Sequence, residues 1–136
     1  MDRVLGPYSE LAYALMRIVV GFLFACHGAQ KIFGLLGGID DAGGTASFGL
    51  IWFAGLIELV GGLLVATGFQ AASAAFLCSG QMAVAYFMAH QGRALFPLQN
   101  GGELAVLYCF VFLFIAARGP GIWSLDARGG RRGARG

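Results

Sequence analysis

Several ionisable or strongly polar side chains lie within, or at the edges of, long apolar segments of the chain. An ionisable group at membrane depth costs about 2.5 to 3.5 kcal/mol on insertion scales, so each one is a candidate site residue. An apolar pocket with a few convergent polar groups is the usual form of a small-molecule site. The candidates for such a pocket are Arg17, His27, Lys31, Glu58, Gln81 and Glu103.

Three of these candidates share one face of the first apolar segment. At about 100° per residue, Arg17, His27 and Lys31 fall within an arc of about 80°. Phe24 and two glycines lie on the same side. We therefore expect this stripe to face the interior of a helix bundle.

The depths of the charges predict which of them meet. With a rise of about 1.5 Å per residue, Glu58 lies between Arg17 and His27 in depth, and Gln81 lies near the same level. Because an unpaired charge in hydrocarbon is costly, we expect a buried Arg17–Glu58 ion pair beside a polar cavity open to the outer leaflet. The alternative is that Arg17 reaches the cytoplasmic head groups while Glu58 is protonated. Whether the pair binds a ligand or only sets the helix register stays open.

A second polar group gathers at the outer side of the membrane. These residues are either interfacial anchors or the mouth of the cavity. The run Asn100-Gly101-Gly102-Glu103 is typical of a loop entering a helix, whose free N–H groups can hold an anionic or carbonyl group. The group consists of Lys31, His90, Gln91, Arg93, Asn100 and Glu103.

The histidines and cysteines form no recognisable metal or redox motif. His27 and His90 differ in depth by about 7 Å, which does not suit two axial ligands of one haem. Cys26, Cys78 and Cys109 lie on three different segments without a C-x-x-C spacing, which favours small core residues over a zinc site or a disulfide relay. We expect no metal site.

Transmembrane helices must hold these residues. The 136-residue chain is 58% hydrophobic and 12% charged, and residues 59–92 carry no formal charge, whereas soluble proteins are about 25% charged. No segment alternates as a barrel strand does, so helices are the remaining way to satisfy the backbone in hydrocarbon. We predict an all-α bundle of four transmembrane helices in residues 1–126, with spans at about 11–33, 50–69, 71–90 and 102–117.

Two further patterns refine this bundle. Gly55, Gly61 and Gly62 flank Glu58 and predict close helix packing, not a nucleotide loop, because no strand precedes them. The spans at 50–69 and 71–90 are so close in sequence that they must form an antiparallel hairpin.

The distribution of basic residues predicts the orientation. Both termini are expected in the cytoplasm, because that side then holds most of the arginines and the outer side only Lys31 and Arg93. Residues 127–136 form a basic Gly/Arg tail that we expect to be disordered and to meet anionic lipid, with no nucleic acid as partner. The cytoplasmic arginines would be Arg3, Arg118, Arg128, Arg131, Arg132 and Arg135.

Several short motifs follow one another along the chain. They are Met16-Arg17 with Gly21, His27-Gly28-Ala29-Gln30-Lys31-Ile32-Phe33-Gly34, Gly55-Leu56-Ile57-Glu58-Leu59-Val60-Gly61-Gly62, Asn100-Gly101-Gly102-Glu103, Arg118-Gly119-Pro120-Gly121 and Trp123-Ser124-Leu125-Asp126. Taken in this order, they resemble the DoxX family of small four-helix bacterial inner-membrane proteins. The resemblance covers nearly the whole chain up to Asp126 and implies a multi-pass protein of the inner membrane.

The same resemblance implies an accessory protein or subunit of a membrane redox complex, linked to thiosulfate:quinone oxidoreduction or oxidative stress. A quinone is then the candidate ligand, with His27 or Glu58 handling protons and Arg17 tuning the electrostatics. Without paired cysteines or a nicotinamide or flavin fingerprint, we expect a non-catalytic subunit. The alternatives are a binding or transport module for a small amphipathic, lipid-like molecule, and an assembly partner of another membrane protein. Oligomerisation also stays open.

Overall fold

A computed structural model describes residues 2–40 and 43–128 of the chain. Over these residues it contains helices and no strand, which confirms the all-α prediction. The helices are α1 (Asp2–Leu5), η1 (Gly6–Tyr8), α2 (Ser9–Phe33), η2 (Leu35–Gly37), α3 (Leu50–Thr67), α4 (Ala71–Ala89), α5 (Pro97–Asn100) and α6 (Glu103–Arg118).

Each of the four predicted spans contains one long helix, namely α2, α3, α4 or α6. Three segments are long and apolar enough to cross a membrane: Gly6–Phe33, Leu50–Thr67 and Ala71–Ala89. Helix α6 has 16 residues, which at about 1.5 Å per residue make about 24 Å, less than the roughly 30 Å of a hydrocarbon core. The fold therefore contains three helices of full span length and a shorter fourth.

Two glycines end helices where the chain must change direction. Gly34 follows α2 with a φ of 67°, and Gly68 follows α3 with a φ of 71°. This left-handed conformation is easy for glycine and lets its N–H bond a carbonyl of the last helical turn, as Gly34 does with Gln30 at 3.1 Å. Only residues 68–70 separate α3 from α4, so these helices form the predicted hairpin.

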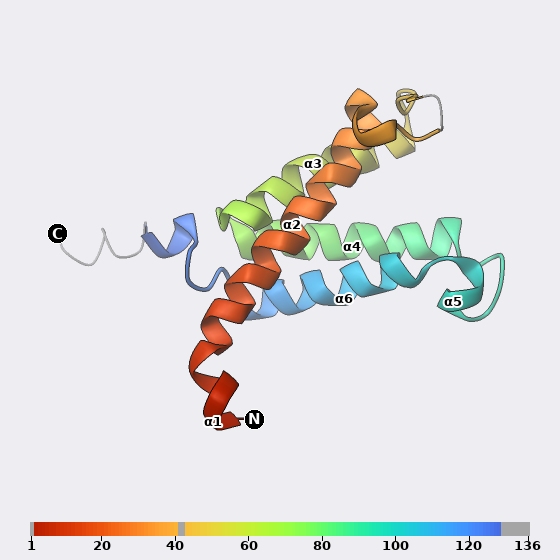
Figure 1. Ribbon diagram of the computed structural model, residues 1–136. Coiled ribbons are helices and arrows are strands. Elements are labelled where there is room, and N and C mark those ends of the chain that lie inside the picture. Colours follow the sequence, from red (N-terminus) through yellow and green to blue (C-terminus); the bar gives the residue numbers. More distant parts are fainter. Residues whose placement is uncertain (1, 41–42, 129–136) are drawn as a thin grey trace.

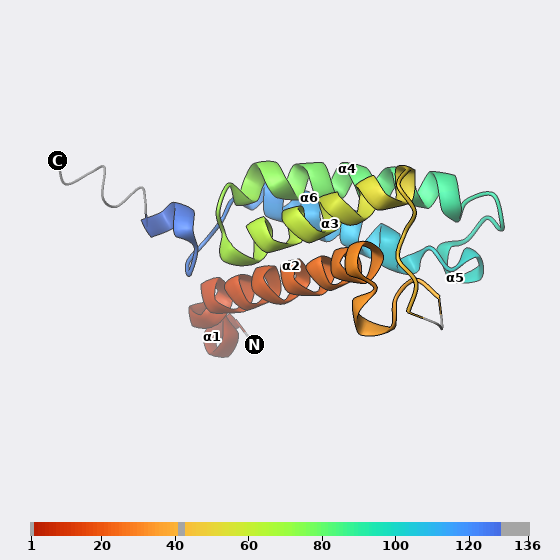
Figure 2. The ribbon, with the colours of Figure 1, turned by 90° about the horizontal axis from the view of Figure 1, so that it is seen from above.

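The four long helices form two antiparallel pairs, α2 with α3 and α4 with α6. Figure 1 shows the pairs close together at the α3–α4 turn and apart at their other ends. Figure 2 shows α2 on one side, α4 on the other and α3 between them. We call the end with the α3–α4 turn the closed end, and the end with loops 34–49 and 90–102 the open end.

Glycines bring α2 and α3 into backbone contact. A Cβ added to Gly21 would lie 2.6 Å from the Ala66 nitrogen and 2.7 Å from the Gly62 oxygen. One added to Gly28 would clash with the Gly55 oxygen in the same way. The predicted close packing at Gly55 and Gly62 is confirmed, and the partner is α2. Gly21 faces Gly62 and Gly28 faces Gly55, which defines one antiparallel register.

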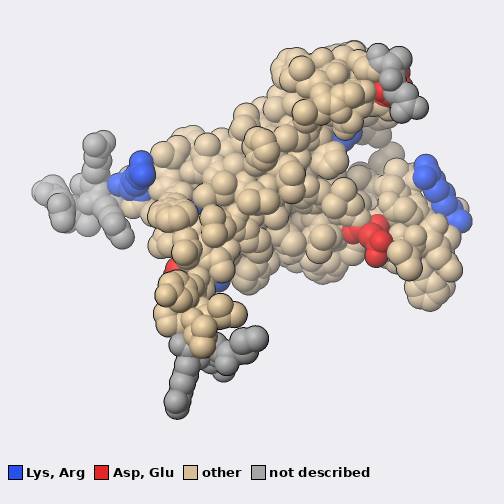
Figure 3. All heavy atoms as spheres, in the orientation of Figure 1, with Lys and Arg blue, Asp and Glu red and all other residues tan. Residues whose placement is uncertain are grey.

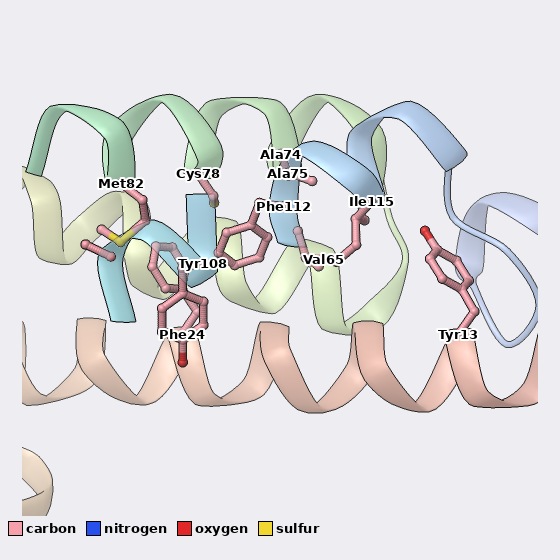
Figure 4. Packing of buried hydrophobic residues seen from close by; sticks show 11 residues of the cluster. Tyr13, Phe24, Val65, Ala74, Ala75, Cys78, Met82, Tyr108, Phe112 and Ile115 are labelled. Atoms are coloured by element: carbon pink, nitrogen blue, oxygen red, sulfur yellow. The ribbon is translucent and has the colours of Figure 1, made fainter. Parts of the chain in front are cut away.

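An aromatic and aliphatic core joins the two pairs. Phe24 of α2 packs against Phe112 and Tyr108 of α6, with ring centroids 4.7 and 5.1 Å apart. Figure 4 shows these rings between α2 and the α4–α6 pair, with Cys78 and Val65 beside them. This packing occupies the middle and the closed end of the bundle, so the open end is left less filled.

At the closed end, the start of α2 contacts the end of α6. Arg118, the last residue of α6, forms an ion pair with Glu10 and lies 4.1 Å from the centroid of the Tyr13 ring. The Tyr13 hydroxyl donates a hydrogen bond to the Gly119 oxygen at 2.5 Å. These contacts tie the start of α2 to the end of α6.

The prediction that disorder begins at residue 127 is wrong for its first two residues. Residues 125–128 form a helical turn, and the Ala127 N–H donates to the Ser124 hydroxyl oxygen at 3.2 Å. Ser124 thus caps this turn, as serine does at helix starts. Residues 129–136, with Arg131, Arg132 and Arg135, lie outside the described part of the chain.

Candidate functional site

A cavity of about 680 Å³ occupies the open end between the two helix pairs. All four long helices contribute to its wall, and 15 of the 21 lining residues are apolar or glycine. Figure 3 shows the molecule hollowed between the ends of α2 and α3 and the ends of α4 and α6. The six lining residues with polar side chains are His27, Lys31, Glu58, Gln81, His90 and Tyr108.

Glu58 is the centre of the polar part of this wall. Its carboxylate forms an ion pair with Lys31 through Oε2, and its Oε1 accepts a hydrogen bond from Gln81 Nε2 at 3.1 Å. The same Gln81 nitrogen donates to the Ala54 oxygen at 3.2 Å. Glu58 is only 3% exposed, so a cation and an amide compensate a carboxylate that would otherwise be buried alone.

Two bonding positions in this cluster are not used by the protein. An ammonium group carries three N–H donors, and the Lys31 side chain, 25% exposed, has Glu58 as its hydrogen-bond partner. Gln81 Oε1 is buried and has no hydrogen-bond partner among the described residues. The wall therefore offers one set of donors and one acceptor beside a neutral ion pair.

The two histidines lie in different surroundings. His27 lines the cavity edge-on to the Tyr108 ring, with centroids 6.1 Å apart and an interplanar angle of 89°. The His90 Nδ1 is 3.1 Å from the Asn100 oxygen, at the end of α4. Among the described residues, no three histidine, cysteine or carboxylate side chains gather where they could hold a metal ion.

The predicted Arg17–Glu58 pair is wrong. Arg17 is fully buried, and its guanidinium donates to the carbonyls of Val65 at 2.6 Å, Ala66 at 2.8 Å and Trp123 at 2.9 Å. The last carbonyls of α3 have no partners within that helix and form the negative end of its dipole, so they attract a cation. Arg17 thus lies at the closed end and does not line the cavity.

The α2–α3 register explains this exchange of partners. With Gly21 opposite Gly62, Arg17 lies opposite Ala66, two helical turns from Glu58. Lys31 instead reaches Glu58 across Gly55, where a Cβ would lie 2.8 Å from the Lys31 Cβ. Because Arg17 and Lys31 lie on the same face of α2, the face alone did not tell which of them pairs with Glu58.

Glu103 is not part of the cavity wall, contrary to the prediction. It is exposed in the first turn of α6, where the positive end of the helix dipole stabilises an acidic side chain. One of the N–H groups that the sequence analysis proposed for an anion at this helix start is already used within the chain. The Gly102 N–H donates to Asn100 Oδ1 at 2.8 Å and to the Pro97 oxygen at 3.0 Å.

Asn100 has a structural role in the loop before α6. Its side chain is 2% exposed, and Nδ2 donates to the Ala94 oxygen at 3.0 Å and to the Tyr86 hydroxyl at 3.2 Å. Of the outer polar group, Lys31 and His90 line the cavity, whereas Gln91 and Arg93 are exposed and do not. The mouth of the cavity is thus less polar than the sequence suggested.

Asp126 is a structural residue that the sequence analysis missed. Its carboxylate accepts the N–H groups of Gln70 at 3.0 Å and Ala71 at 3.2 Å, and so caps α4 from a distant part of the chain. A signal was available, because α4 starts after Gly68-Phe69-Gln70 without a serine, threonine or aspartate to cap it.

Comparisons with known proteins agree with the earlier resemblance. A family model described as DoxX matches residues 12–91, which include the cavity residues His27, Lys31, Glu58 and Gln81. A Haemophilus influenzae protein described as an uncharacterized protein is 40% identical over 127 residues, covering 90% of this chain and 93% of that protein. No solved structure matches the chain.

Proposed function

The chain belongs to the DoxX family, and on that premise we propose that its cavity binds a quinone-type ligand within the membrane. In this proposal the protein is a non-catalytic accessory subunit of a membrane redox complex. The ligand is an uncharged molecule with an apolar body and a polar ring that carries oxygen atoms. The single observation behind it is the Lys31–Glu58–Gln81 cluster in the wall of an otherwise apolar cavity.

The size and lining of the cavity support a ligand of this kind. Its volume of about 680 Å³ lies within the range of roughly 300 to 1,000 Å³ that is usual for small-molecule pockets. Fifteen apolar or glycine lining residues suit a hydrocarbon body. A soluble, strongly hydrated substrate would lose its water there without compensation.

The polar cluster supports an uncharged head group. Because Lys31 and Glu58 neutralise each other, an anionic or cationic ligand would add an unpaired charge to a buried site. The free Lys31 donors match a ligand carbonyl, and the unpartnered Gln81 Oε1 matches a ligand hydroxyl. A quinone and its reduced form present these two groups.

Among the ionisable side chains of the cavity wall, His27 and Glu58 are the proposed proton-exchanging groups. In this proposal they give protons to, or accept protons from, the ligand oxygens. Arg17 takes no part, because its guanidinium bonds backbone carbonyls at the closed end. The protein thus supplies binding and protons, while electrons come from a partner enzyme.

A second candidate ligand is a small amphipathic lipid. The dominance of apolar lining residues favours it as well, since an acyl or isoprenoid chain fills the same space. A role as an assembly partner that presents glycine faces is less well supported. Gly21, Gly28, Gly55 and Gly62 are all buried in the contact between α2 and α3, so a partner helix does not reach them.

The membrane topology belongs to the same proposal. We propose four spans with both termini in the cytoplasm of a bacterium and the protein in its inner membrane. Helix α6 is the fourth span, and Arg118 at its end reaches outward to Glu10, as arginine does at membrane interfaces. The open end then faces the outer side, as the excess of arginine on the opposite side favours.

Mass spectrometry of the ligand that co-purifies with the protein tests the proposal. The full chain is extracted in mild detergent, and bound quinone is measured per mole of folded protein. We expect the wild type to retain quinone and Glu58→Gln to lose most of it, because the Lys31 ammonium is then unpaired. Glu10→Gln is the matched control, since it removes the acid of the other ion pair, which lies at the closed end.

The outcomes separate the candidate functions. If the wild type retains a lipid and no quinone, and Glu58→Gln loses that lipid, the result supports the amphipathic-lipid candidate against the quinone. Equal quinone in the wild type and in Glu58→Gln contradicts the proposed site. Failure of Glu58→Gln alone to accumulate indicates that the pair is needed for assembly, and Gln81→Met then tests the same wall without changing charge.

A further inference from the structure

The four most exposed large apolar side chains of the described chain all lie in the loops of the open end. They are Phe48 (80%), Leu95 (79%), Leu98 (75%) and Leu36 (70%). Figures 1 and 2 both place these loops at the same end of the molecule, and residues at their edges, such as Leu50 and Gly101, line the cavity. Loops that face water rarely display such a set, so this end needs an apolar environment.

The loop before α6 buries a polar side chain and exposes apolar ones. The one buried side chain in residues 91–100 is the amide of Asn100, at 2% exposed, whereas Leu95, Phe96 and Leu98 are exposed beside the polar Gln91, Arg93 and Gln99. Asn100 bonds Gly102, Ala94 and Tyr86. A loop with bonded polar groups inside and a mixed apolar and polar exterior suits the membrane interface, where apolar side chains enter the lipid and polar ones reach the head groups.

The described residues of loop 34–49, which are 34–40 and 43–49, also expose large apolar side chains beside polar ones. The loop backbone is fixed by the Ala46 N–H, which donates to the Lys31 oxygen at 2.7 Å, and by the Ile39 N–H, which donates to the Gly44 oxygen at 2.9 Å. Ala46 is buried, whereas Phe48 and Leu36 are exposed. Both loops therefore present apolar side chains from defined backbones next to the cavity mouth.

One side of the cavity opens between α3 and α4. Its rim, which we call the α3–α4 edge, consists of cavity-lining side chains that are also exposed at the outer surface: Ile51 (57%), Leu77 (56%), Val84 (53%) and Met88 (66%). None of them is ionisable, and Glu58 lies behind them at 3%. Figure 1 shows α3 diverging from α4 from the turn onwards.

We infer that the cavity is loaded sideways from the lipid phase across the α3–α4 edge, with residues 34–40, 43–49 and 90–102 lying in the membrane interface as its outer boundary. The ligand is then a molecule dissolved in the bilayer, and it reaches Lys31 and Glu58 without crossing water. This inference rests on the proposed function and adds the route and the phase from which the ligand comes.

A loading experiment tests the route. Full-length protein in vesicles that contain decylubiquinone is captured at intervals, and quinone per protein is measured by mass spectrometry. We expect Val84→Phe to slow loading several-fold relative to the wild type, because a larger side chain narrows the α3–α4 edge. The matched control is Val60→Phe, since Val60 is 47% exposed on α3 and does not line the cavity.

A fluorescence experiment tests the position of the loop. Leu98→Trp in a Trp52→Phe/Trp123→Phe background places one reporter on loop 90–102, because the chain has two tryptophans. We expect strong quenching by lipids brominated near the head group and weak quenching by aqueous iodide. The opposite order overturns the placement of the loop.

The two proposals fail in different ways. If every variant loads at the same rate, and iodide quenches the Leu98→Trp fluorescence more strongly than the brominated lipids do, the route is wrong and the quinone site stands. If the wild type retains no decylubiquinone, the proposed function is wrong and the route with it. Should Val84→Phe not fold, Met88→Phe carries the same test one helical turn further along α4.

Discussion

Replacement of Arg17 by methionine tests the interpretation of the closed end. The wild-type guanidinium joins three parts of the chain, since it belongs to α2 and bonds the carbonyls of Val65 and Ala66 in α3 and of Trp123 after α6. Methionine keeps the apolar stem and removes every donor. We expect the closed end to loosen while the Lys31–Glu58 cluster at the open end stays intact.

The magnitude follows from the three bonds shorter than 3.0 Å. A hydrogen bond to a charged group contributes about 1.5 to 3 kcal/mol, so three of them represent a gross loss of about 4 to 9 kcal/mol. The penalty for burying the fully enclosed cation, several kcal/mol, disappears with the side chain and offsets part of this. We expect a net decrease in the free energy of unfolding of about 3 kcal/mol.

Unfolding in mixed detergent micelles, followed by circular dichroism, measures this difference. Arg118→Met is the matched control, because Arg118 also ends near the closed end but forms an exposed ion pair with Glu10. Such surface pairs contribute about 1 kcal/mol or less. Arg17→Lys should fall between the wild type and Arg17→Met, since one ammonium does not span carbonyls on two segments as a guanidinium does.

Two results would refute this reasoning. If Arg17→Met unfolds at the same denaturant concentration as Arg118→Met, the carbonyl contacts do not hold the closed end together. If Arg17→Met retains full stability but loses its co-purifying ligand, Arg17 acts on the cavity, and the Arg17–Glu58 pair expected from the sequence is restored.

Two further predictions concern helix packing and capping. Gly62→Ala should destabilise the protein by about 1 to 3 kcal/mol, because the new Cβ would lie 2.5 Å from the Ala25 nitrogen. The control Gly80→Ala, which has open space around it, should be neutral or stabilise the protein by up to about 1 kcal/mol. Equal unfolding midpoints of the two variants would contradict the close α2–α3 contact. Asp126→Ala should lower the free energy of unfolding by about 1 kcal/mol, because α4 loses its cap. Amide hydrogen exchange at Gln70 and Ala71 should become faster. Unchanged exchange at these two amides would contradict the capping role of Asp126.

Much of the fold was predictable from local sequence. Long apolar segments, the uncharged stretch 59–92 and the glycine breaks predicted the all-helical architecture. The 3.6-residue period predicted that Arg17 and Phe24 face the interior, and both are buried. These properties follow from local sequence, because a helix makes its backbone hydrogen bonds within one segment. The spacing of apolar residues along that segment predicts which side of the helix is buried.

The choice of partners depended on the tertiary structure. Glu58 pairs with Lys31 and not with Arg17 because the glycine contacts set the register of α2 against α3. Arg17 instead bonds carbonyls at the end of α3 and after α6, and Asp126 caps a helix that begins 55 residues earlier. Such contacts join distant segments, and their geometry arises only when whole helices pack, so no local pattern of residue types determines them.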